Sequence, residues 1–99
     1  NNSIYLNRRD KMVKTLRNIG LEVVTPKAGL YVWAKLPGGW TSASFTAALL
    51  EETNIVVTPG TGYGKSGEGF IRLSLTTPDD RIDQGLKRLS EWHMPSPKS

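Results

Sequence analysis

A chain of 99 residues with 37% hydrophobic and 22% charged side chains is typical of one small globular domain and not of a disordered protein. The net charge of +4 arises in the first twenty residues, where five basic side chains outnumber Asp10, which indicates a solvated basic helix. The lack of cysteine excludes disulfides and thiolate chemistry and is typical of a cytoplasmic protein. No apolar run is long enough to cross a bilayer, and no signal-peptide pattern is present.

The first half of the chain predicts a helix, two strands and a second helix. Apolar residues share one helical face from about Ser3 to Ile19, and Gly20 supplies the stop. A short strand is expected over residues 21–25 and an alternating strand over residues 30–36. Within the alternating strand, Leu30 and the other even-numbered residues face inward, and the odd-numbered residues Tyr31, Trp33 and Lys35 face outward.

A second helix is expected to begin at Thr41 or Ser42 and to end at Asn54. A buried strand over residues 55–58, a glycine-rich loop, a strand over residues 70–75 and a helix from Pro78 to about Trp92 follow. The order α-β-β-α-β-β-α predicts an α+β fold, a small and mostly antiparallel sheet with helices on one face. We expect this domain to span residues 1–93, with a flexible tail over residues 94–99.

The strand over residues 70–75 carries the candidate binding residue, Arg72. Ile71, Leu73 and Leu75 face one side of this strand, and Arg72 faces the other. The preceding loop, PGTGYGKSGEG, is rich enough in glycine for two backbones to approach closely. A guanidinium on a stiff strand can bind a planar carboxylate or phosphate through two parallel hydrogen bonds. A surface ion pair is the alternative role, and the residues alone leave both open.

The outward face of the predicted sheet combines aromatic and basic residues. Such a surface is unusual in contact with water, so we expect another part of the protein to cover it. The segment GFIRLSL is also similar to an aromatic RNA-binding strand, but the basic residue and the paired ring positions of that motif are missing. The residues on this face are Tyr31, Trp33, Lys35, Phe70, Arg72 and Ser74.

Three other patterns have simpler explanations. The glycines within residues 62–67 satisfy G-x-G-x-x-G, but a strand follows them where a dinucleotide site needs a helix. His93 is the sole histidine and, without cysteine, predicts no metal site. Asp79 and Asp80 stand in a first helical turn, where the helix dipole favours acids.

The chain resembles the C-terminal small domain of PLP-dependent class I/II aminotransferases, with the closest likeness to the aspartate, alanine and LL-diaminopimelate aminotransferase branch. Three segments carry the resemblance and cover nearly the whole chain in the family's order. They are RRDKMVKTLRNIGLEV (Arg8–Val23), PKAGLYVWAKLP (Pro26–Pro37) and TPGTGYGKSGEGFIRLSLTTPDDRIDQGLKRL (Thr58–Leu89).

The resemblance implies that Arg72 binds the α-carboxylate of amino-acid and 2-oxo-acid substrates. It also implies that Ala28, Gly29 and Tyr31 lie near the active-site entrance. The implied cofactor is pyridoxal 5'-phosphate, which the family's large domain holds through a Schiff-base lysine and a phosphate cup. The family's full-length enzymes are homodimers, so the resemblance implies a homodimeric parent as well.

The large domain is not part of this sequence, which opens at Asn1 without a methionine and looks like a piece of a longer chain. The lysines that could be mistaken for the catalytic one match no lysine motif of the family; they are Lys27, Lys35 and Lys65. We therefore expect an aminotransferase fragment that is inactive alone and holds no cofactor or metal by itself. We expect neither a nucleic acid nor a membrane as its partner.

Two other functions stay open at this point. One is a non-catalytic amino-acid-binding or interaction module that reuses the fold. The other is a nucleic-acid-binding domain that uses the aromatic sheet face. A lysine-bearing large domain encoded directly upstream would exclude the first, and salt-sensitive RNA binding would favour the second.

Overall fold

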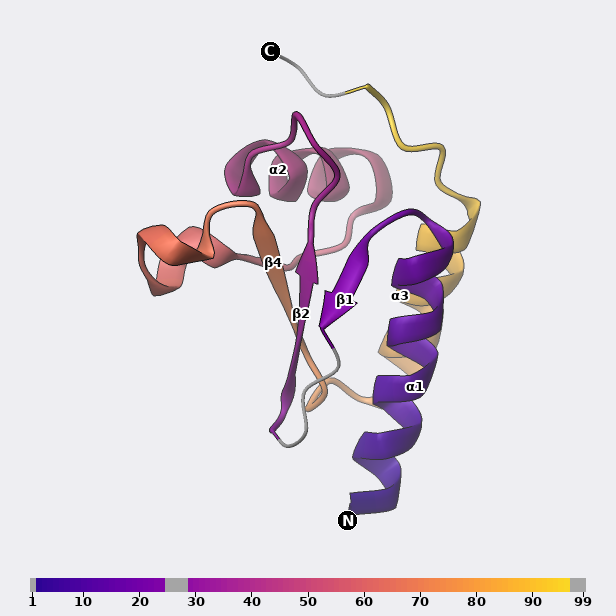
Figure 1. Cartoon of the computed structure of the whole chain (residues 1–99). Coiled ribbons are helices and arrows are strands. Elements are labelled where there is room, and N and C mark those ends of the chain that lie inside the picture. Colours follow the sequence, from indigo (N-terminus) through magenta and orange to yellow (C-terminus); the bar gives the residue numbers. More distant parts are fainter. Residues whose placement is uncertain (1, 25–28, 97–99) are drawn as a thin grey trace.

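The computed structural model describes residues 2–24 and 29–96 (Figure 1). Within these ranges the predicted order α-β-β-α-β-β-α and the α+β class are confirmed. The helices and strands are α1 (Asn2–Asn18), β1 (Glu22–Val24), β2 (Tyr31–Lys35), α2 (Ser42–Thr53), β3 (Thr58–Pro59), β4 (Phe70–Ser74) and α3 (Asp79–Glu91). Two short 3-10 turns, η1 (Gly60–Tyr63) and η2 (Lys65–Gly67), form the glycine-rich loop.

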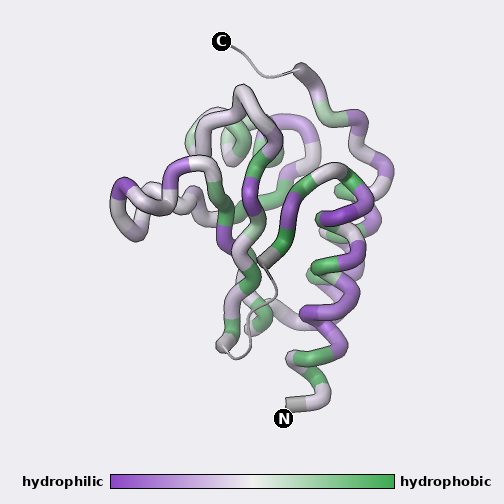
Figure 2. The backbone as a smooth tube through the Cα atoms, viewed as in Figure 1, coloured by the Kyte–Doolittle hydropathy of each residue, from purple (hydrophilic) through white to green (hydrophobic). Residues whose placement is uncertain are grey.

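The four strands form one antiparallel sheet in the order β1-β2-β4-β3. The two central strands, β2 and β4, pair so that Trp33 lies opposite Arg72 and Tyr31 lies opposite Ser74. Since successive side chains of a strand point to opposite faces, this register places the outward residues of both strands on one surface. Figure 2 shows hydrophobic and hydrophilic residues following one another along these strands.

The opposite face of the sheet forms the core together with the helices. Val32, Ala34 and Ile71 are completely buried on this face. Helices α1 and α3 lie side by side, and α2 packs against β3 and β4 (Figure 1). The helices contribute their apolar stripes to the same cluster, chiefly Met12, Val13, Leu16, Phe45, Leu49, Ile82 and Leu89. Burial of these apolar surfaces supplies most of the driving force for the fold.

The ends of α2 follow the sequence signals closely. Thr41 accepts a hydrogen bond from the Ser44 backbone N–H at 3.0 Å, and the Ser44 hydroxyl accepts one from the Thr41 N–H at 3.0 Å. Asn54 ends the helix in the left-handed conformation, with φ of 60°. These contacts satisfy backbone groups that a helix leaves unpaired at its termini.

Helix α3 begins one residue later than its sequence suggests. Pro78 takes the cap position itself, and its carbonyl accepts hydrogen bonds from the N–H groups of Arg81 and Ile82. Proline has no backbone N–H to donate to a preceding carbonyl, so the helix begins at the residue after it. Beyond the helix, Met94 is partly buried and packs against the core.

Two expectations for the strands are wrong. Leu30 is 40% exposed, because β2 begins after it and its side chain does not join the core. The strand predicted over residues 55–58 is confined to Thr58–Pro59, and Val56 is 80% exposed. Residues 55–57 connect the end of α2 to the sheet edge, where β3 pairs with β4 alone. An edge strand tolerates Pro59, since one side of it needs no ladder hydrogen bond.

Among the described helices, none is long and apolar enough to span a membrane.

Candidate functional site

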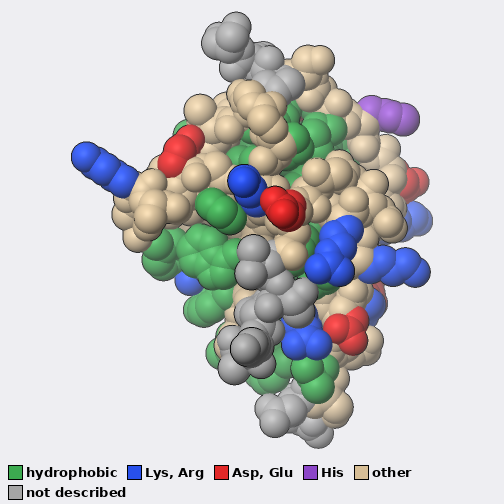
Figure 3. All heavy atoms as spheres, viewed as in Figure 1, with side chains coloured by type: hydrophobic (Ala, Val, Ile, Leu, Met, Phe, Trp, Pro, Cys, Tyr) green, Lys and Arg blue, Asp and Glu red, His purple; other side chains and the backbone are tan. Residues whose placement is uncertain are grey.

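The candidate site lies on the sheet face opposite the core. Trp33, Phe70, Arg72 and Ser74 are half-buried there, and Tyr31 is 39% exposed. Figure 3 shows hydrophobic side chains gathered on the surface beside the glycine-rich loop. The loop covers part of this face, so the aromatic surface is less open than its sequence suggests.

Arg72 lies between two tyrosine rings. The central carbon of its guanidinium is 3.8 Å from the ring centroid of Tyr31 and 4.4 Å from that of Tyr63. Tyr63 also meets Trp33 edge to face, with 5.5 Å between the ring centroids. Within residues 2–24 and 29–96, no hydrogen bond or ion pair to the Arg72 side chain accompanies these contacts. The arginine is held by ring faces and keeps its donor groups for another ligand.

Two glycines bring the loop that carries Tyr63 back onto itself. A Cβ atom added at Gly60 would overlap the backbone carbonyl of Gly67, and one added at Gly67 would overlap the carbonyl of Gly60. No other residue fits such a contact, which confirms that the glycine-rich sequence serves close backbone approach. The loop is therefore compact, and its aromatic residue has a defined place beside β4.

Ser42 joins this loop to the start of α2 and of β4. Its side chain is completely buried, donates to the Phe70 carbonyl at 3.0 Å and accepts from the Gly69 N–H at 2.9 Å. The Ser42 backbone N–H donates to the Glu68 carboxylate at 3.2 Å. These hydrogen bonds fix the point from which β4 carries Arg72 outward, two residues after Phe70.

The other end of β4 is fixed by Arg8 of α1. Its guanidinium donates from Nε to Asp79 Oδ1 at 2.7 Å and from Nη1 to the Leu75 carbonyl at 2.8 Å. The hydrogen bond from Arg8 lowers the pKa of Asp79 below its ordinary value of 3.8. A second cross-helix pair, Lys11 with Asp83 at 2.7 Å, lies one turn further along. Asp79 therefore has a tertiary partner in addition to the helix dipole that its sequence position indicates.

The structure brings two of the predicted site residues together, since Tyr31 contacts Arg72 directly. Gly29 lies two residues before Tyr31 in an exposed turn, with φ of 122°. Ala28 lies outside the described residues. Sequence reasoning missed Tyr63, because only the loop's closure brings it to β4. The signal was present in the sequence as the single aromatic residue among the glycines of PGTGYG.

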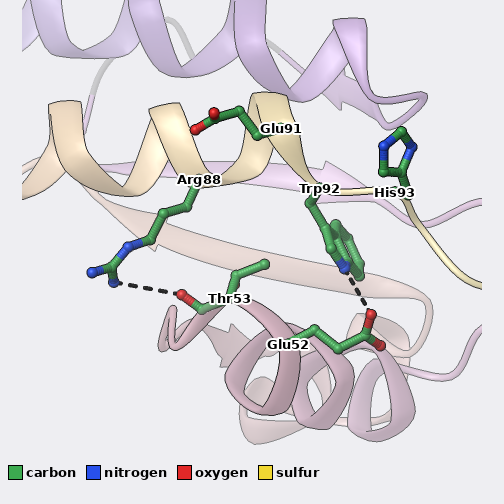
Figure 4. Close-up of a pocket in the computed structure, with 6 residues that line it drawn as sticks. All are labelled: Glu52, Thr53, Arg88, Glu91, Trp92 and His93. Atoms are coloured by element: carbon green, nitrogen blue, oxygen red, sulfur yellow. Dashed lines mark hydrogen bonds between the residues drawn. The ribbon is translucent and has the colours of Figure 1, made fainter.

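A separate hollow of about 590 Å³ lies where α2 meets the end of α3 (Figure 4). Its polar groups bond mainly to one another. Trp92 Nε1 donates to Glu52 at 3.0 Å, and Arg88 donates weakly to the Thr53 carbonyl at 3.5 Å. This mutual pairing is typical of a packed helix seam. The lining residues are Glu52, Thr53, Arg88, Glu91, Trp92 and His93.

Comparison with curated proteins gives relatives that include LL-diaminopimelate aminotransferases. The chain is 58% identical over 92 residues to an LL-diaminopimelate aminotransferase of Dehalococcoides mccartyi. The matched region covers 93% of this chain and 24% of the relative. It is 47% identical over 89 residues to LL-diaminopimelate aminotransferase 2 of a Nostoc species, covering 90% of the chain and 23% of the relative. The chain thus spans about a quarter of the length of these curated relatives.

Solved structures agree with this likeness. An aromatic aminotransferase from Pyrococcus horikoshii OT3 superposes with a TM-score of 0.84 at 32% identity, over 90% of this chain and 24% of that protein. An LL-diaminopimelate aminotransferase from Chlamydomonas reinhardtii gives a TM-score of 0.82 at 34% identity, over 90% and 22%. A family model described as aminotransferase class I and II matches residues 1–89. The chain therefore belongs to the class I and II aminotransferase family.

Proposed function

We propose that this chain is the small domain of a PLP-dependent amino-acid aminotransferase, in which Arg72 binds the α-carboxylate of the substrate. The observation that carries the proposal is the state of Arg72, a half-buried guanidinium stacked between two rings. An arginine in a structural ion pair needs an acidic neighbour. In the described part of the chain, the ion pairs involve Arg8, Arg9 and Lys11. The arrangement of Arg72 favours a ligand over an ion pair.

A carboxylate suits the free edge of this guanidinium. Two parallel N–H groups of arginine match the two oxygens of a carboxylate, and such charge-assisted hydrogen bonds are roughly twice as strong as neutral ones. Both tyrosine rings contact the guanidinium carbon, so its N–H edge remains available to a carboxylate. A substrate held in this way has its α-carbon in a defined position, which lowers the entropic part of the barrier to reaction.

The family depends on pyridoxal 5'-phosphate, and the residues described here do not fit that cofactor alone. Helix N-termini commonly hold phosphates, but the N-terminus of α2 is filled by its capping box and by the Glu68 carboxylate. Lys35 and Lys65 are exposed, whereas a lysine that reacts with a carbonyl group is activated by burial or by a neighbouring cation. We therefore assign the cofactor to the part of the parent enzyme that supplies the family's large domain.

The 99-residue chain alone is accordingly expected to retain no cofactor and to have no transaminase activity. The test is to mix the chain with pyridoxal 5'-phosphate, remove the free cofactor, and reduce with borohydride. Scattered weak labelling of surface lysines is the expected result. A single stoichiometric adduct together with transamination would contradict this part of the proposal.

The relatives point to one substrate class. The named relatives with 44–58% identity are LL-diaminopimelate aminotransferases, which supports an amino donor with an α-carboxylate beside the transferred amine. We propose LL-diaminopimelate as the first substrate to test. Arg72 would bind the carboxylate on the reacting carbon, and the rest of the substrate would meet residues outside this chain.

A chimeric enzyme tests the role of Arg72. This chain replaces the matching 92 residues of the Dehalococcoides mccartyi relative, and kcat/KM for LL-diaminopimelate is measured. Arg72→Ala should cost on the order of 2–5 kcal/mol of transition-state stabilisation, with cofactor binding nearly intact. Arg72→Lys should also fail substantially, because a single ammonium cannot reproduce the planar fork.

Arg81→Ala is the matched control, since Arg81 is an exposed arginine on α3. It should leave kcat/KM unchanged. Normal kinetics for both Arg72 variants in an active chimera would overturn the proposal. That outcome would identify Arg72 as a surface arginine that contributes at most about 1 kcal/mol to the free energy of unfolding.

A further inference from the structure

The two rings that contact Arg72 come from separate parts of the fold. The resemblance places Tyr31 near the active-site entrance but gives neither ring a role toward Arg72. We infer that Tyr31 and Tyr63 are positioning residues that orient the Arg72 guanidinium for carboxylate binding. The inference rests on the proposed function of Arg72 and assigns the specificity of that contact to two further side chains. It concerns the faces of the tyrosine rings and not their hydroxyl groups.

Two rings from different elements contact the guanidinium. Tyr31 approaches from β2, two residues before Trp33, the residue opposite Arg72, and its ring lies 3.8 Å from the guanidinium carbon. Tyr63 approaches from η1 with its ring at 4.4 Å. Both distances are well inside the range of about 6 Å over which a cation and a ring face attract each other. Rotation of the guanidinium plane would push it into one ring or the other.

Ring faces hold a cation without competing for its ligand. A neighbouring carboxylate would also fix Arg72, but it would use the same N–H donors and neutralise the charge that attracts the substrate. The tyrosines leave the donor edge and the positive charge intact. They also restrict a long side chain before the substrate arrives, so less conformational entropy is lost on binding.

The place of Tyr63 depends on the closure of the glycine-rich loop. The contact between Gly60 and Gly67 folds the loop, and Ser42 bonds to the backbone on both sides of its end. Trp33 then supports the edge of Tyr63 from the sheet. The loop thus brings a second ring to the Arg72 guanidinium, which explains why so compact a loop carries an exposed aromatic residue.

The experiment compares leucine and phenylalanine at both positions in the active chimera. Leucine removes the ring face, whereas phenylalanine keeps it and removes only the hydroxyl. Tyr31→Leu and Tyr63→Leu should each lower kcat/KM for LL-diaminopimelate by about 3- to 30-fold, the range that corresponds to a cation–ring contact. Tyr31→Phe and Tyr63→Phe should stay within about 2-fold of the parent chimera, because a phenyl face also attracts a cation.

A second measurement isolates carboxylate binding from chemistry. Pimelate, the seven-carbon dicarboxylate without amino groups, serves as a non-reacting inhibitor. Its inhibition constant should rise by the same factor as kcat/KM falls in the leucine variants, and it should stay unchanged in the phenylalanine variants. Tyr5→Leu is the control, since Tyr5 lies on α1 with its ring 5.8 Å from a different arginine, Arg8.

A third measurement uses the 99-residue chain itself. The rings should shift the NMR signals of the Arg72 side-chain protons upfield, and each leucine variant should reverse part of that shift. Leucine variants with unchanged kinetics and inhibition would overturn the inference, as would phenylalanine variants that fail as badly as leucine. Failure of the proposed function is distinguishable, because in that case Arg72→Ala itself would leave kcat/KM unchanged.

Discussion

The two faces of the sheet are built from the same strands but are held by different forces. On the inner face, Val32, Ala34 and Ile71 are completely buried against the helices. On the outer face, Arg72 and its two tyrosines make a few directed contacts that remain partly open to water. Burial is non-directional and accounts for most of the stability, whereas the ring contacts fix the direction of one charge. Substitutions on the two faces should therefore separate stability from binding.

The largest expected effect is on the inner side, at Phe45. Its side chain is completely buried and meets Trp40 and Trp92 edge to face, with ring centroids 5.2 and 5.7 Å away. Phe45→Ala should lower the free energy of unfolding by about 3–5 kcal/mol, because it leaves a cavity that the neighbours fill only in part. Urea unfolding of the chain followed by circular dichroism measures the change.

Tyr31→Leu is the outer-face counterpart and should change the free energy of unfolding by about 1 kcal/mol or less. Equal losses for the two variants would show that the faces are not as different as their contacts indicate.

The stability of the glycine-rich loop should be sensitive to one added methyl group at Gly60. A Cβ atom there would overlap the Gly67 carbonyl and lie 2.8 Å from the Phe70 carbonyl oxygen. Gly60→Ala should cost about 1–3 kcal/mol of unfolding free energy, since the backbone must shift to relieve the overlap. Gly62→Ala is the matched control, because the nearest atom to its added Cβ, in Thr58, is 3.9 Å away. A Gly60 variant as stable as the Gly62 variant would contradict the close approach.

Ser42 should have an effect of the same kind and of similar size. Ser42→Ala removes the acceptor for the Gly69 N–H and the donor to the Phe70 carbonyl, at a completely buried position. The expected loss is about 1–3 kcal/mol of unfolding free energy, the usual cost of leaving buried polar groups unpaired. Ser90→Ala serves as control, since that exposed hydroxyl bonds only to Lys87 of its own helix. A neutral Ser42 variant would show that the loop does not depend on this hydrogen bond.

The smallest effect concerns pH and Asp79, which is exposed and pairs with Arg8. Because its pKa in the folded chain lies below the ordinary 3.8, its ionised form stabilises the fold above that pH. This contribution is lost as the pH falls through the lower folded value. The stability difference between the parent chain and Asp79→Asn should be largest near neutral pH and should shrink as the solution becomes more acidic than about pH 4.

Arg8→Leu provides the check, since in that background Asp79→Asn should no longer change the pH dependence. Salt should also weaken the effect, because exposed charges are screened. A difference between parent and variant that grows at acid pH would contradict the direction of the pKa shift.

The inner face was predictable from the sequence because burial leaves a periodic trace. Alternation located β2 and β4, and helical spacing located the stripes of Met12, Leu16, Ile82 and Leu89. The predictions fail in segments whose hydrophobic residues show no helical or strand periodicity. Ile55 and Val57 pack against the core, but they form no strand and connect α2 to the edge strand β3.

The outer face was predictable only in part. Alternation placed Arg72 and Tyr31 on one surface, and the register of β2 and β4 joins them. Tyr63 could not be placed, because its contact with Arg72 depends on backbone closure between Gly60 and Gly67. Such a contact depends on how the loop folds back on itself, and no regular residue spacing in the sequence indicates it.

The most direct test of the central claim is a crystal structure of the active chimera with bound pimelate. The measured quantity is the distance from the Arg72 guanidinium nitrogens to the nearest carboxylate oxygens. The account predicts two parallel N–H···O contacts of about 2.7–2.9 Å, with the guanidinium still between Tyr31 and Tyr63. A carboxylate held by other side chains, with Arg72 more than about 4 Å away, would contradict the account.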